Sequence, residues 1–448
     1  MNEILEKTPE ETAPNVPTLK EAFWYWLKLG LISFGGPAGQ IAIMHKDLVE
    51  DKRWISEKRF LHALNYCMVL PGPEAQQLAT YIGWLMHKTR GGLIAGGLFV
   101  LPSLLILMVL SYIYMRFGNT PIVAGVLYGI KPAVVAIVLF AAYRIGSRAL
   151  KNNALWAIAA ASFLAITLLK LPFPLIVGLS AFIGYSGNRF APKFFSGSGG
   201  HQAADKSYGK AVIDDDTPTP AHANFSWRGM VNFLAIGIAI WLLGMALLTT
   251  IYGWQSIYTQ MAWFFTKAAL LTFGGAYAVL PYVVQGAVTH YAWLTATQMI
   301  DGLALGETTP GPLIMVVAFV GFVGGWQHTA PYSPLVSAII AACVVTFFTF
   351  LPSFIFIFMG APFIESTKNN LKLNAPLTAI TAAVVGVIVA LALFLALQVF
   401  WPGKTSIDWL AMLAATLGFI ALFKFKVSTI KLIGAFALLG LAHSFLSA

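Results

Sequence analysis

Apolar residues occur along the chain in runs long enough to cross a membrane as helices. Four such runs, each of about 20 residues or more, lie at 91–115, 122–143, 231–252 and 375–400. A helix of about 20 apolar residues spans a hydrocarbon layer of roughly 30 Å. A membrane-spanning β-barrel would instead show alternating segments of about 10 residues. The pattern therefore predicts an all-α polytopic membrane protein.

Four other apolar segments contain helix-breaking residues in their interior. They lie at 20–44, 60–87, 259–285 and 297–326. The breaks are of two kinds, a glycine pair after a phenylalanine and a proline–glycine–proline triplet, and each kind occurs twice: Phe34-Gly35-Gly36, Phe273-Gly274-Gly275, Pro71-Gly72-Pro73 and Pro310-Gly311-Pro312. In both kinds of break, every residue of the second occurrence stands 239 residues after its counterpart. Because two rare signatures share one register, we interpret the chain as a duplicated unit.

The duplication extends beyond the breaks and divides the chain into five parts. Leu101-Pro102-Ser103 returns as Leu351-Pro352-Ser353, at an offset of 250 residues. Between the copies lie a segment rich in Gly, Ser and Asp, which is typical of a linker, and one apolar helix without a counterpart. The parts are a polar N-terminal tail at 1–19, a first repeat at 20–187, a flexible polar linker at 188–228, an extra helix at 229–256 and a second repeat at 257–448.

Basic residues in the loops predict how the two repeats are oriented. The loop at 45–59 contains five Lys and Arg residues, whereas its counterpart at 286–297 contains none. By the positive-inside rule, the first loop lies in the cytoplasm and the second outside. The extra helix accounts for this difference, because one more span reverses the second copy. The sequence thus predicts two inverted-topology repeats, and the loop bias explains most of the formal net charge of +10.

The broken segments are expected to enter the membrane and return on the same side, as re-entrant or half-helical elements. With that arrangement most basic loops, including the linker at 188–228, fall in the cytoplasm. If all segments crossed, most of these loops would fall outside. Non-helical backbone is tolerated at membrane depth only where protein or a water-filled cavity surrounds it. The breaks are therefore predicted to line a cavity.

The breaks create helix ends inside the membrane, and helix N-termini carry free N–H groups and a partial positive charge. Such ends suit a small anion near the midplane. The alternative is that the breaks are packing notches and kinks, which are common in membrane helices. The repetition of both signatures favours a binding site. The candidate anion-binding residues are Lys28, Ser33, Gly35, Gly36, Pro71, Gly72, Lys267, Thr272, Gly274, Gly275, Pro310 and Gly311.

Two lysines in equivalent positions add positive charge beside the glycine breaks. Lys28 and Lys267 each stand six residues before the phenylalanine of the break. Ionisable groups within membrane segments are costly, so they often mark the path of an ion. The alternative is that the two side chains extend to lipid headgroups. The sequence leaves both interpretations open.

Two acidic residues near the breaks are not duplicated, unlike the lysines. Glu74 directly follows the first proline–glycine–proline triplet, and Glu307 stands three residues before the second. A carboxyl group in an apolar environment favours its neutral form and can carry a proton. We therefore take these two residues as candidates for proton coupling. The alternatives are capping of the helix after the break and a partner for Lys267.

The chain lacks the sequence motifs of several enzyme and metal-site classes. It has no Gly-x-x-x-x-Gly-Lys-Ser/Thr phosphate loop, no His/Cys cluster with metal-ligand spacing and no Ser/His/Asp set in a soluble domain. Its only cysteines are Cys67 and Cys343, which give no disulfide framework. No cleavable signal peptide is evident. We expect no enzyme activity, no catalytic residue, no metal and no cofactor.

Several motifs occur together in a combination typical of one known family. They are Phe34-Gly35-Gly36-Pro37, the run Leu70-Pro71-Gly72-Pro73-Glu74-Ala75-Gln76-Gln77-Leu78-Ala79, Gly129-Ile130-Lys131-Pro132, Phe273-Gly274-Gly275 and Thr309-Pro310-Gly311-Pro312. As a set they resemble the chromate ion transporter (CHR) family in its long-chain, bidomain, ChrA-like form. The resemblance covers nearly the whole chain outside the tail and the linker. It implies export of chromate through the plasma membrane of a bacterium, driven by the membrane potential or a proton gradient, and resistance to chromate.

The residues by themselves indicate only a transporter of a small oxyanion. Chromate and sulfate are both tetrahedral dianions of similar size, so helix-end donors would separate them poorly. The alternatives are a sulfate or other oxyanion transporter of the same fold, an uncoupled anion channel and a membrane scaffold without transport. The expected partners are the oxyanion and the lipid bilayer, with no nucleic acid. The oligomeric state, a homodimer included, stays open.

Overall fold

The computed structural model describes residues 14–34, 36–190, 192–195, 208–218, 220–328, 331–366, 374–402 and 406–446. Within these ranges the regular elements are helices, and the only β-pairing is an isolated bridge between Ile55 and Ile213. Six of the described helices are long and apolar enough to cross a membrane: Glu74–Phe117, Pro121–Ala149, Trp227–Tyr252, Pro334–Ser366, Ala375–Phe400 and Thr429–Leu446. The chain is therefore an all-α, multi-pass membrane protein, as predicted.

The first copy and the start of the linker contain eight described α-helices and one π-helix. In chain order these elements are α1 (Leu19–Ile32), α2 (Gly36–His45), the π-helix η1 (Lys46–Asp51), α3 (Glu57–Val69), α4 (Glu74–Phe117), α5 (Pro121–Ala149), α6 (Asn153–Thr167), α7 (Phe173–Phe190) and α8 (Pro192–Phe195). The sequence predicts separate helices at 60–87 and 91–116, whereas α4 continues through this point with non-helical backbone at His87 and Lys88. A kink therefore replaces the expected loop.

The second copy follows a short 3-10 turn and the additional helix. The elements are η2 (Ala221–Ala223), α9 (Trp227–Tyr252), α10 (Ile257–Leu270), α11 (Ala276–Val284), the π-helix η3 (Gln285–His290), α12 (Ala296–Thr308), η4 (Leu313–Met315), α13 (Val316–Gln327), α14 (Pro334–Ser366), α15 (Asn374–Phe400), α16 (Trp409–Phe423) and α17 (Thr429–Leu446). Helix α9 contains the apolar run that has no counterpart in the first copy. The predicted helix breaks are confirmed, since a helix ends before each signature and another begins within or after it.

The two copies fold alike in local detail. The π-helices η1 and η3, and the helices α3 and α12, begin and end at positions that differ by 239 residues. Positive φ angles recur at the same offset, at Gly36 (73°) and Gly275 (94°) and at Gly72 (133°) and Gly311 (101°). Glycine adopts such angles without the steric cost that a Cβ atom brings. The repeated glycines thus produce repeated backbone turns.

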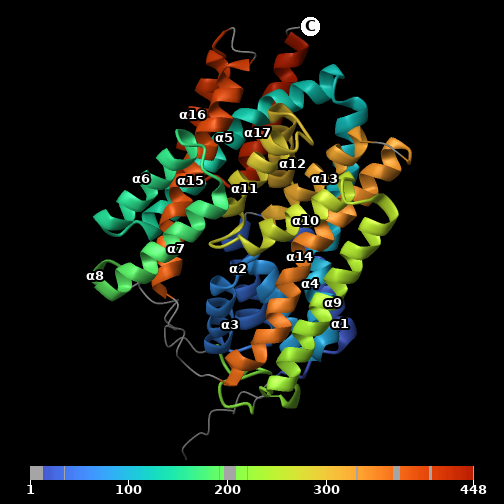
Figure 1. Cartoon of the computed structure of the whole chain (residues 1–448), viewed down its shortest axis with the longest axis vertical. Helices are drawn as coiled ribbons and strands as arrows, with labels where there is room; N and C mark the ends of the chain where they lie inside the picture. Colours follow the sequence, from blue (N-terminus) through green and yellow to red (C-terminus); the bar gives the residue numbers. More distant parts are fainter. Residues whose placement is uncertain are drawn as a thin grey trace, which may run out of the picture.

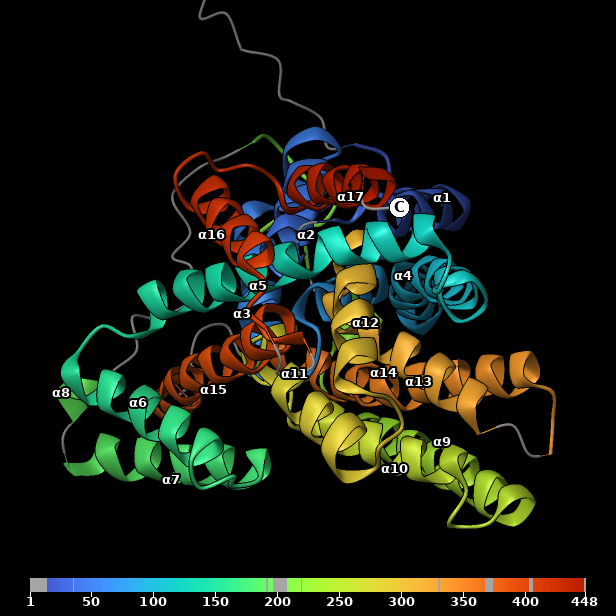
Figure 2. The same ribbon diagram turned by 90° about the horizontal axis from the view of Figure 1, so that it is seen from above.

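Helices α4 and α14 pack against each other near the middle of the molecule, as seen in Figure 1. Gly92 of α4 lies against Phe358, and Gly96 lies against Phe354. Because the contact moves backward along α14 as it moves forward along α4, the two helices are antiparallel. On one side α15 packs against α6 and α7, and these three helices lie side by side in both Figure 1 and Figure 2. Helices α1 and α9 lie on the other side of α4 and α14.

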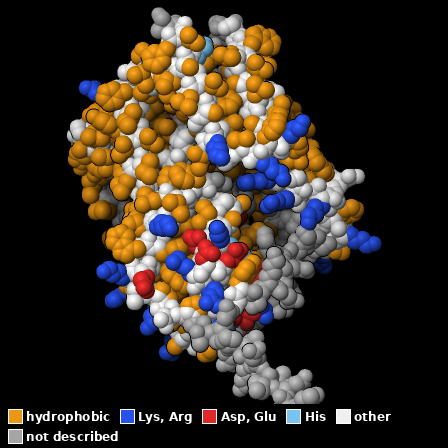
Figure 3. Space-filling model, turned by 180° about the vertical axis from the view of Figure 1, so that it is seen from behind, with side chains coloured by type: hydrophobic (Ala, Val, Ile, Leu, Met, Phe, Trp, Pro, Cys, Tyr) orange, Lys and Arg blue, Asp and Glu red, His pale blue; other side chains and the backbone are white. Residues whose placement is uncertain are grey.

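Charged side chains are unevenly distributed over the surface. Seen from behind, Lys, Arg, Asp and Glu gather mainly in the lower half of the molecule, whereas hydrophobic side chains cover most of the upper half (Figure 3). Large exposed hydrophobic residues are frequent on the outer helices, among them Leu243 (71% exposed) and Leu438 (68%). A soluble protein rarely exposes so much contiguous apolar surface, and lipid is the environment that it fits.

The linker from residue 208 onward packs against the first copy. Backbone N–H groups of Val212 and Ile213 donate to the carbonyls of Arg53 and Trp54, at 2.9 and 3.1 Å. The guanidinium of Arg59 donates to the carbonyl of Thr217 at 2.7 Å. This segment therefore covers the start of α3.

Candidate functional site

The four helix breaks lie together and are hydrogen-bonded across the two copies. The backbone N–H of Gly72 donates to the carbonyl of Thr272 at 2.7 Å. The backbone N–H of Gly311 donates to the carbonyl of Ser33 at 2.8 Å. These two bonds join equivalent residues in exchanged order, since 239 positions separate Gly72 from Gly311 and Ser33 from Thr272. Each proline–glycine–proline break thus contacts the glycine break of the other copy.

The local chemistry of the prolines and glycines explains why helices end here. Proline lacks an N–H group and disfavours a helical conformation in the residue before it. Helix α3 accordingly ends at Val69, and Pro73 occupies the N-cap position of α4. At the other breaks Gly36 begins α2 and Gly275 is the N-cap of α11. The cluster therefore contains the N-terminal ends of several helices, whose first N–H groups have no partner within the helix.

The hydroxyl groups of Ser33 and Thr272 are used within their own helices. Ser33 Oγ donates to the carbonyl of Leu29 at 2.5 Å, and Thr272 Oγ1 donates to that of Ala268 at 2.7 Å. Both residues are fully buried. In this conformation their carbonyl groups hold the cluster together, and their hydroxyls would have to rotate to reach a ligand.

Two serines that the sequence-based prediction did not select each lie beside one of the breaks. Ser353 Oγ is so close to Gly72 that a Cβ atom on this glycine would stand 2.4 Å from it. Ser103 Oγ would stand 3.1 Å from a Cβ atom on Gly311. Both serines are buried, and neither hydroxyl has a hydrogen-bond partner among the described residues. The repeated Leu-Pro-Ser motif was the available signal for both.

Two glutamines on the first copy hydrogen-bond to the breaks, and a third, Gln76, precedes Gln77 on α4. Gln40 Nε2 donates to the carbonyls of Gly311 and Ser33, at 2.6 and 3.2 Å. Gln77 Nε2 donates to the carbonyl of Pro71 at 2.8 Å. The side-chain oxygens of Gln76 and Gln77 are buried without a described partner. The amide groups of Gln40 and Gln77 thus satisfy carbonyls that the breaks release.

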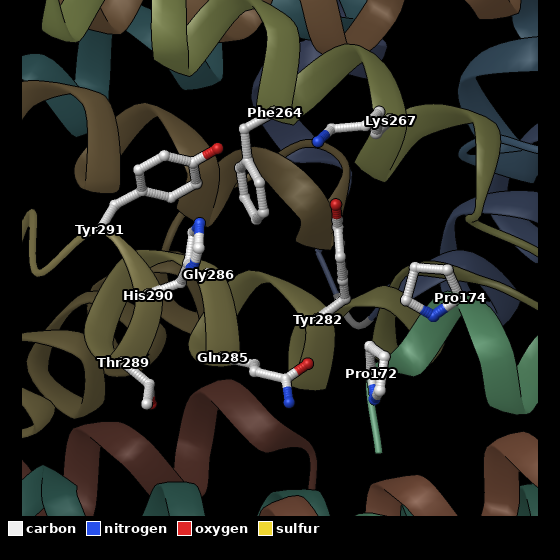
Figure 4. A pocket seen from close by; sticks show the side chains of 10 residues that line it. All are labelled: Pro172, Pro174, Phe264, Lys267, Tyr282, Gln285, Gly286, Thr289, His290 and Tyr291. Carbon is white, nitrogen blue, oxygen red and sulfur yellow. The ribbon is translucent and has the colours of Figure 1, made fainter. Parts of the chain in front are cut away.

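The structure places the two predicted lysines in different surroundings. Lys28 is exposed on α1. Lys267 is partly buried on α10, with Nζ 5.4 Å from the ring centre of Trp263. It lines a pocket of about 430 Å³, shown in Figure 4, whose lining includes neither Lys28 nor the break residues. The sequence-based assignment of both lysines to one anion site stays a prediction.

The two predicted proton carriers lie next to the breaks. Glu74 is the first residue of α4, directly after the N-cap, and is partly buried. Glu307 lies in the last turn of α12, where its Oε1 accepts a hydrogen bond from the hydroxyl of Tyr277 at 2.7 Å. Among the described residues neither carboxylate forms an ion pair within 4.0 Å. Neither carboxylate is therefore held ionised by a direct ion pair.

Two ion pairs connect the copies through the helices that lead to the breaks. Asp301 of α12 lies 3.2 Å from Lys131 Nζ of α5, and it accepts a hydrogen bond from the hydroxyl of Tyr114 at 3.0 Å. Arg59 of α3 lies 2.8 Å from Glu365 at the end of α14. Asp301 and Glu365 are buried. Each ion pair ties the helix before a proline–glycine–proline break to a long helix of the other copy.

Comparison with known proteins identifies relatives over almost the whole chain. The family described as "Chromate transporter" matches residues 20–185 and 259–441. A "Chromate transport protein" of Cupriavidus metallidurans is 30% identical over 96% of this chain and 94% of its own length. One from Pseudomonas aeruginosa is 32% identical over the same shares, and a "Probable chromate transport protein" of Synechococcus elongatus is 27% identical over 85% of each chain. No solved structure shows a significant match.

Proposed function

The chain belongs to the chromate transporter family, and we propose that it is a secondary transporter that exports chromate across the bacterial plasma membrane and so gives resistance to chromate. Relatives named as chromate transport proteins cover almost its entire length. The observation that carries the mechanism is the paired bonding of the four breaks, Gly72 to Thr272 and Gly311 to Ser33. It supports one shared anion site, to which both repeats contribute equivalent residues.

We infer that the two repeats have opposite orientations in the membrane. Equivalent helices of an inverted pair run in opposite directions, and the antiparallel packing of α4 and α14 supports this arrangement. The charge difference between the loops at 45–59 and 286–297 supports it independently. The loop at 45–59 and the linker at 188–228 then face the cytoplasm. Opposed repeats around a central site are a common basis of alternating access.

The proposed anion site lies at the four breaks. Helix N-termini offer N–H donors and a partial positive charge, and the hydroxyls of Ser103 and Ser353 add two donors that now have no described acceptor. A tetrahedral dianion can accept such bonds on several oxygens at once. Export of a dianion moves two negative charges outward, which an inside-negative potential favours by about 4.6 kcal/mol per 100 mV.

Glu74 and Glu307 are the proposed proton carriers. Both lie beside the breaks, where a bound proton would alter the charge that the anion meets. Their unequal positions in the two copies imply different duties. Since the second copy has Leu313 where the first has Glu74, and the first has Met68 where the second has Glu307, each copy would contribute one carrier.

Flux measurements test the proposal directly. Everted membrane vesicles containing the protein should accumulate radiolabelled chromate, and an imposed proton gradient should change the rate. In proteoliposomes Glu74→Gln and Glu307→Gln should each abolish the response to pH, because glutamine cannot carry the proton. Asp216→Asn, which changes an exposed carboxylate of the linker, is the matched control.

Each alternative gives a different result in these experiments. A strong preference for radiolabelled sulfate over chromate would identify the protein as a sulfate transporter of the same fold. Flux that ignores the proton gradient and is unchanged in both glutamine variants would indicate an uncoupled channel. The absence of any flux would contradict transport of either anion.

A further inference from the structure

The pocket at Lys267 has a chemical character that the proposed transport mechanism does not use. It lies between the turn before α7, the end of α10 and the elements α11 and η3, with a volume of about 430 Å³. Figure 4 shows the amino group of Lys267 directed inward, toward Phe264 and Tyr282. The polar lining consists of Lys267, Tyr282, Gln285, Thr289, His290 and Tyr291. No carboxylate lines the pocket, so its charge is positive.

The corresponding region of the first repeat contains three acids, together with Lys46 and Lys52 at the counterparts of Gln285 and Tyr291. The counterparts of Gly286, Thr289 and His290 are Asp47, Glu50 and Asp51. Burial and the charge of Asp51 raise the pKa of Asp47, and the positive charge of Lys28 opposes this shift. Lys28 is therefore close enough to a carboxylate to be partly compensated.

Lys267 has no acidic residue at the corresponding positions. Its surroundings carry a glycine, a threonine and a histidine where the first repeat carries three acids. It forms no ion pair among the described residues, and the ring of Trp263 is its one described electrostatic partner. A lysine at an apolar surface is costly unless an anion or the headgroup region receives it.

Exposed apolar side chains lie near the pocket, and they suit contact with lipid. Trp263, Lys267 and Leu270 lie on one face of α10, and the two apolar residues are 37% and 44% exposed. Leu168 and Leu169, in the turn that leads to the lining residue Pro172, are 72% and 69% exposed. Such exposed apolar residues beside a lysine and a tryptophan are typical of a helix at the lipid boundary.

We propose that this pocket binds the phosphate group of an anionic phospholipid. The ammonium group of Lys267 supplies the charge, and the hydroxyls of Tyr282, Tyr291 and Thr289 supply further donors in the lining. The volume falls within the roughly 300–1,000 Å³ of small-molecule sites. It suits a phosphate with its glycerol better than a bare tetrahedral ion. The bound lipid would bridge α7 of the first repeat to α10 and α11 of the second.

Thermal unfolding of the purified full-length protein in maltoside detergent tests this site. Phosphatidylglycerol should raise the Tm of the unaltered protein more than phosphatidylcholine does, with a Tm that rises as the lipid concentration rises. Lys267→Ala should reduce the affinity for phosphatidylglycerol at least tenfold. Lys28→Ala is the matched control, because it removes the equivalent lysine from a region where an acidic residue already compensates it, and it should leave the lipid effect unchanged.

A second variant covers the case in which Lys267→Ala does not fold. Gln285→Glu places a carboxylate in the pocket with little change in shape, and it should weaken the effect of phosphatidylglycerol by repulsion. An effect of equal size in both variants and in the unaltered protein would overturn the proposal. Stabilisation by inorganic phosphate or chromate alone, dependent on Lys267 and absent with lipid, would also overturn it and would assign the pocket to an aqueous anion. The result does not depend on whether the protein exports chromate, because no flux is measured.

Discussion

Ser103 and Ser353 are buried serines whose hydroxyl groups lack, among the described residues, the hydrogen bond that other serines in this protein make. Serine within a helix commonly donates to a carbonyl one turn earlier, as Ser33 and Ser180 do here. The hydroxyls of Ser103 and Ser353 make no such bond in the described structure. A buried hydroxyl without a partner costs about 1–3 kcal/mol. A protein tolerates that cost where a ligand supplies the missing acceptor, and both serines face a break.

Replacing these serines should therefore weaken chromate binding. A hydrogen bond to a charged group contributes about 1.5–3 kcal/mol, so Ser103→Ala and Ser353→Ala should each raise the half-saturation concentration for chromate uptake by roughly tenfold or more. The measurement is the concentration dependence of uptake into everted vesicles. Ser111→Ala is the control, since Ser111 is also buried and unpartnered on α4 but lies two turns beyond Ser103. Equal constants for all three variants would exclude the serines from the site.

At the scale of elements, the helix breaks are decided by local chemistry. Gly72 and Gly311 have φ angles of 133° and 101°, which an L-residue with a side chain adopts only at a cost. The prolines beside them remove backbone donors. Both effects act within a few residues, so the positions of the breaks could be predicted without knowledge of the fold. The course of α4 through His87 could not be predicted in this way, because the surrounding helices decide whether the chain kinks or forms a loop.

Gly311→Ala should disrupt the cluster of breaks. The new Cβ atom would stand 2.8 Å from Ser103 Cβ, at a backbone angle that favours glycine. We expect a loss of at least about 2 kcal/mol of stability, seen as a lower Tm, together with loss of transport. Gly97→Ala is the control, because a Cβ atom there would meet no heavy atom within 4 Å and the site lies inside α4. That change should be neutral or stabilising by up to about 1 kcal/mol. If both variants unfold alike, the backbone angle at Gly311 has no special role.

At the scale of the whole molecule, the two repeats are held together by polar contacts that the repeat pattern does not predict. Lys131 has no basic counterpart in the second repeat, and Asp301 stands opposite His62 in the first. In the structure Lys131 and Asp301 form an ion pair, with the hydroxyl of Tyr114 on the second carboxylate oxygen. Because residues outside the internal symmetry make this contact, it can differ in strength from the Arg59–Glu365 pair. Conformational changes would then act unequally on the two halves.

Replacing only the cationic partner of this ion pair should destabilise the protein more than replacing both partners. Lys131→Ala leaves a buried carboxylate without its cation, which costs about 3–5 kcal/mol. Combining it with Asp301→Asn removes the uncompensated charge and should recover at least half of the lost Tm. A double-mutant cycle on the purified protein measures this coupling. Additive effects of the two single changes would show that the ion pair contributes no energy of its own.

The sequence by itself determined the features that depend on neighbouring residues. Apolar run length gave the membrane-spanning class, and the shared offset of 239 residues gave the duplication. The glycines and prolines gave the helix breaks, because φ angles and missing N–H groups are properties of single residues. The roles of Glu74 and Glu307 remain predictions from the same local pattern.

Only the tertiary structure decided which distant groups meet. It brought Gly72 to Thr272 and set Ser353 against the break of the other copy. It also separated the surroundings of Lys28 and Lys267, although their local sequences share Trp and Leu at the same spacing. Contacts between segments hundreds of residues apart follow from the packing of whole helices. A lysine's partners therefore depend on which helix faces it, and no local pattern records that choice.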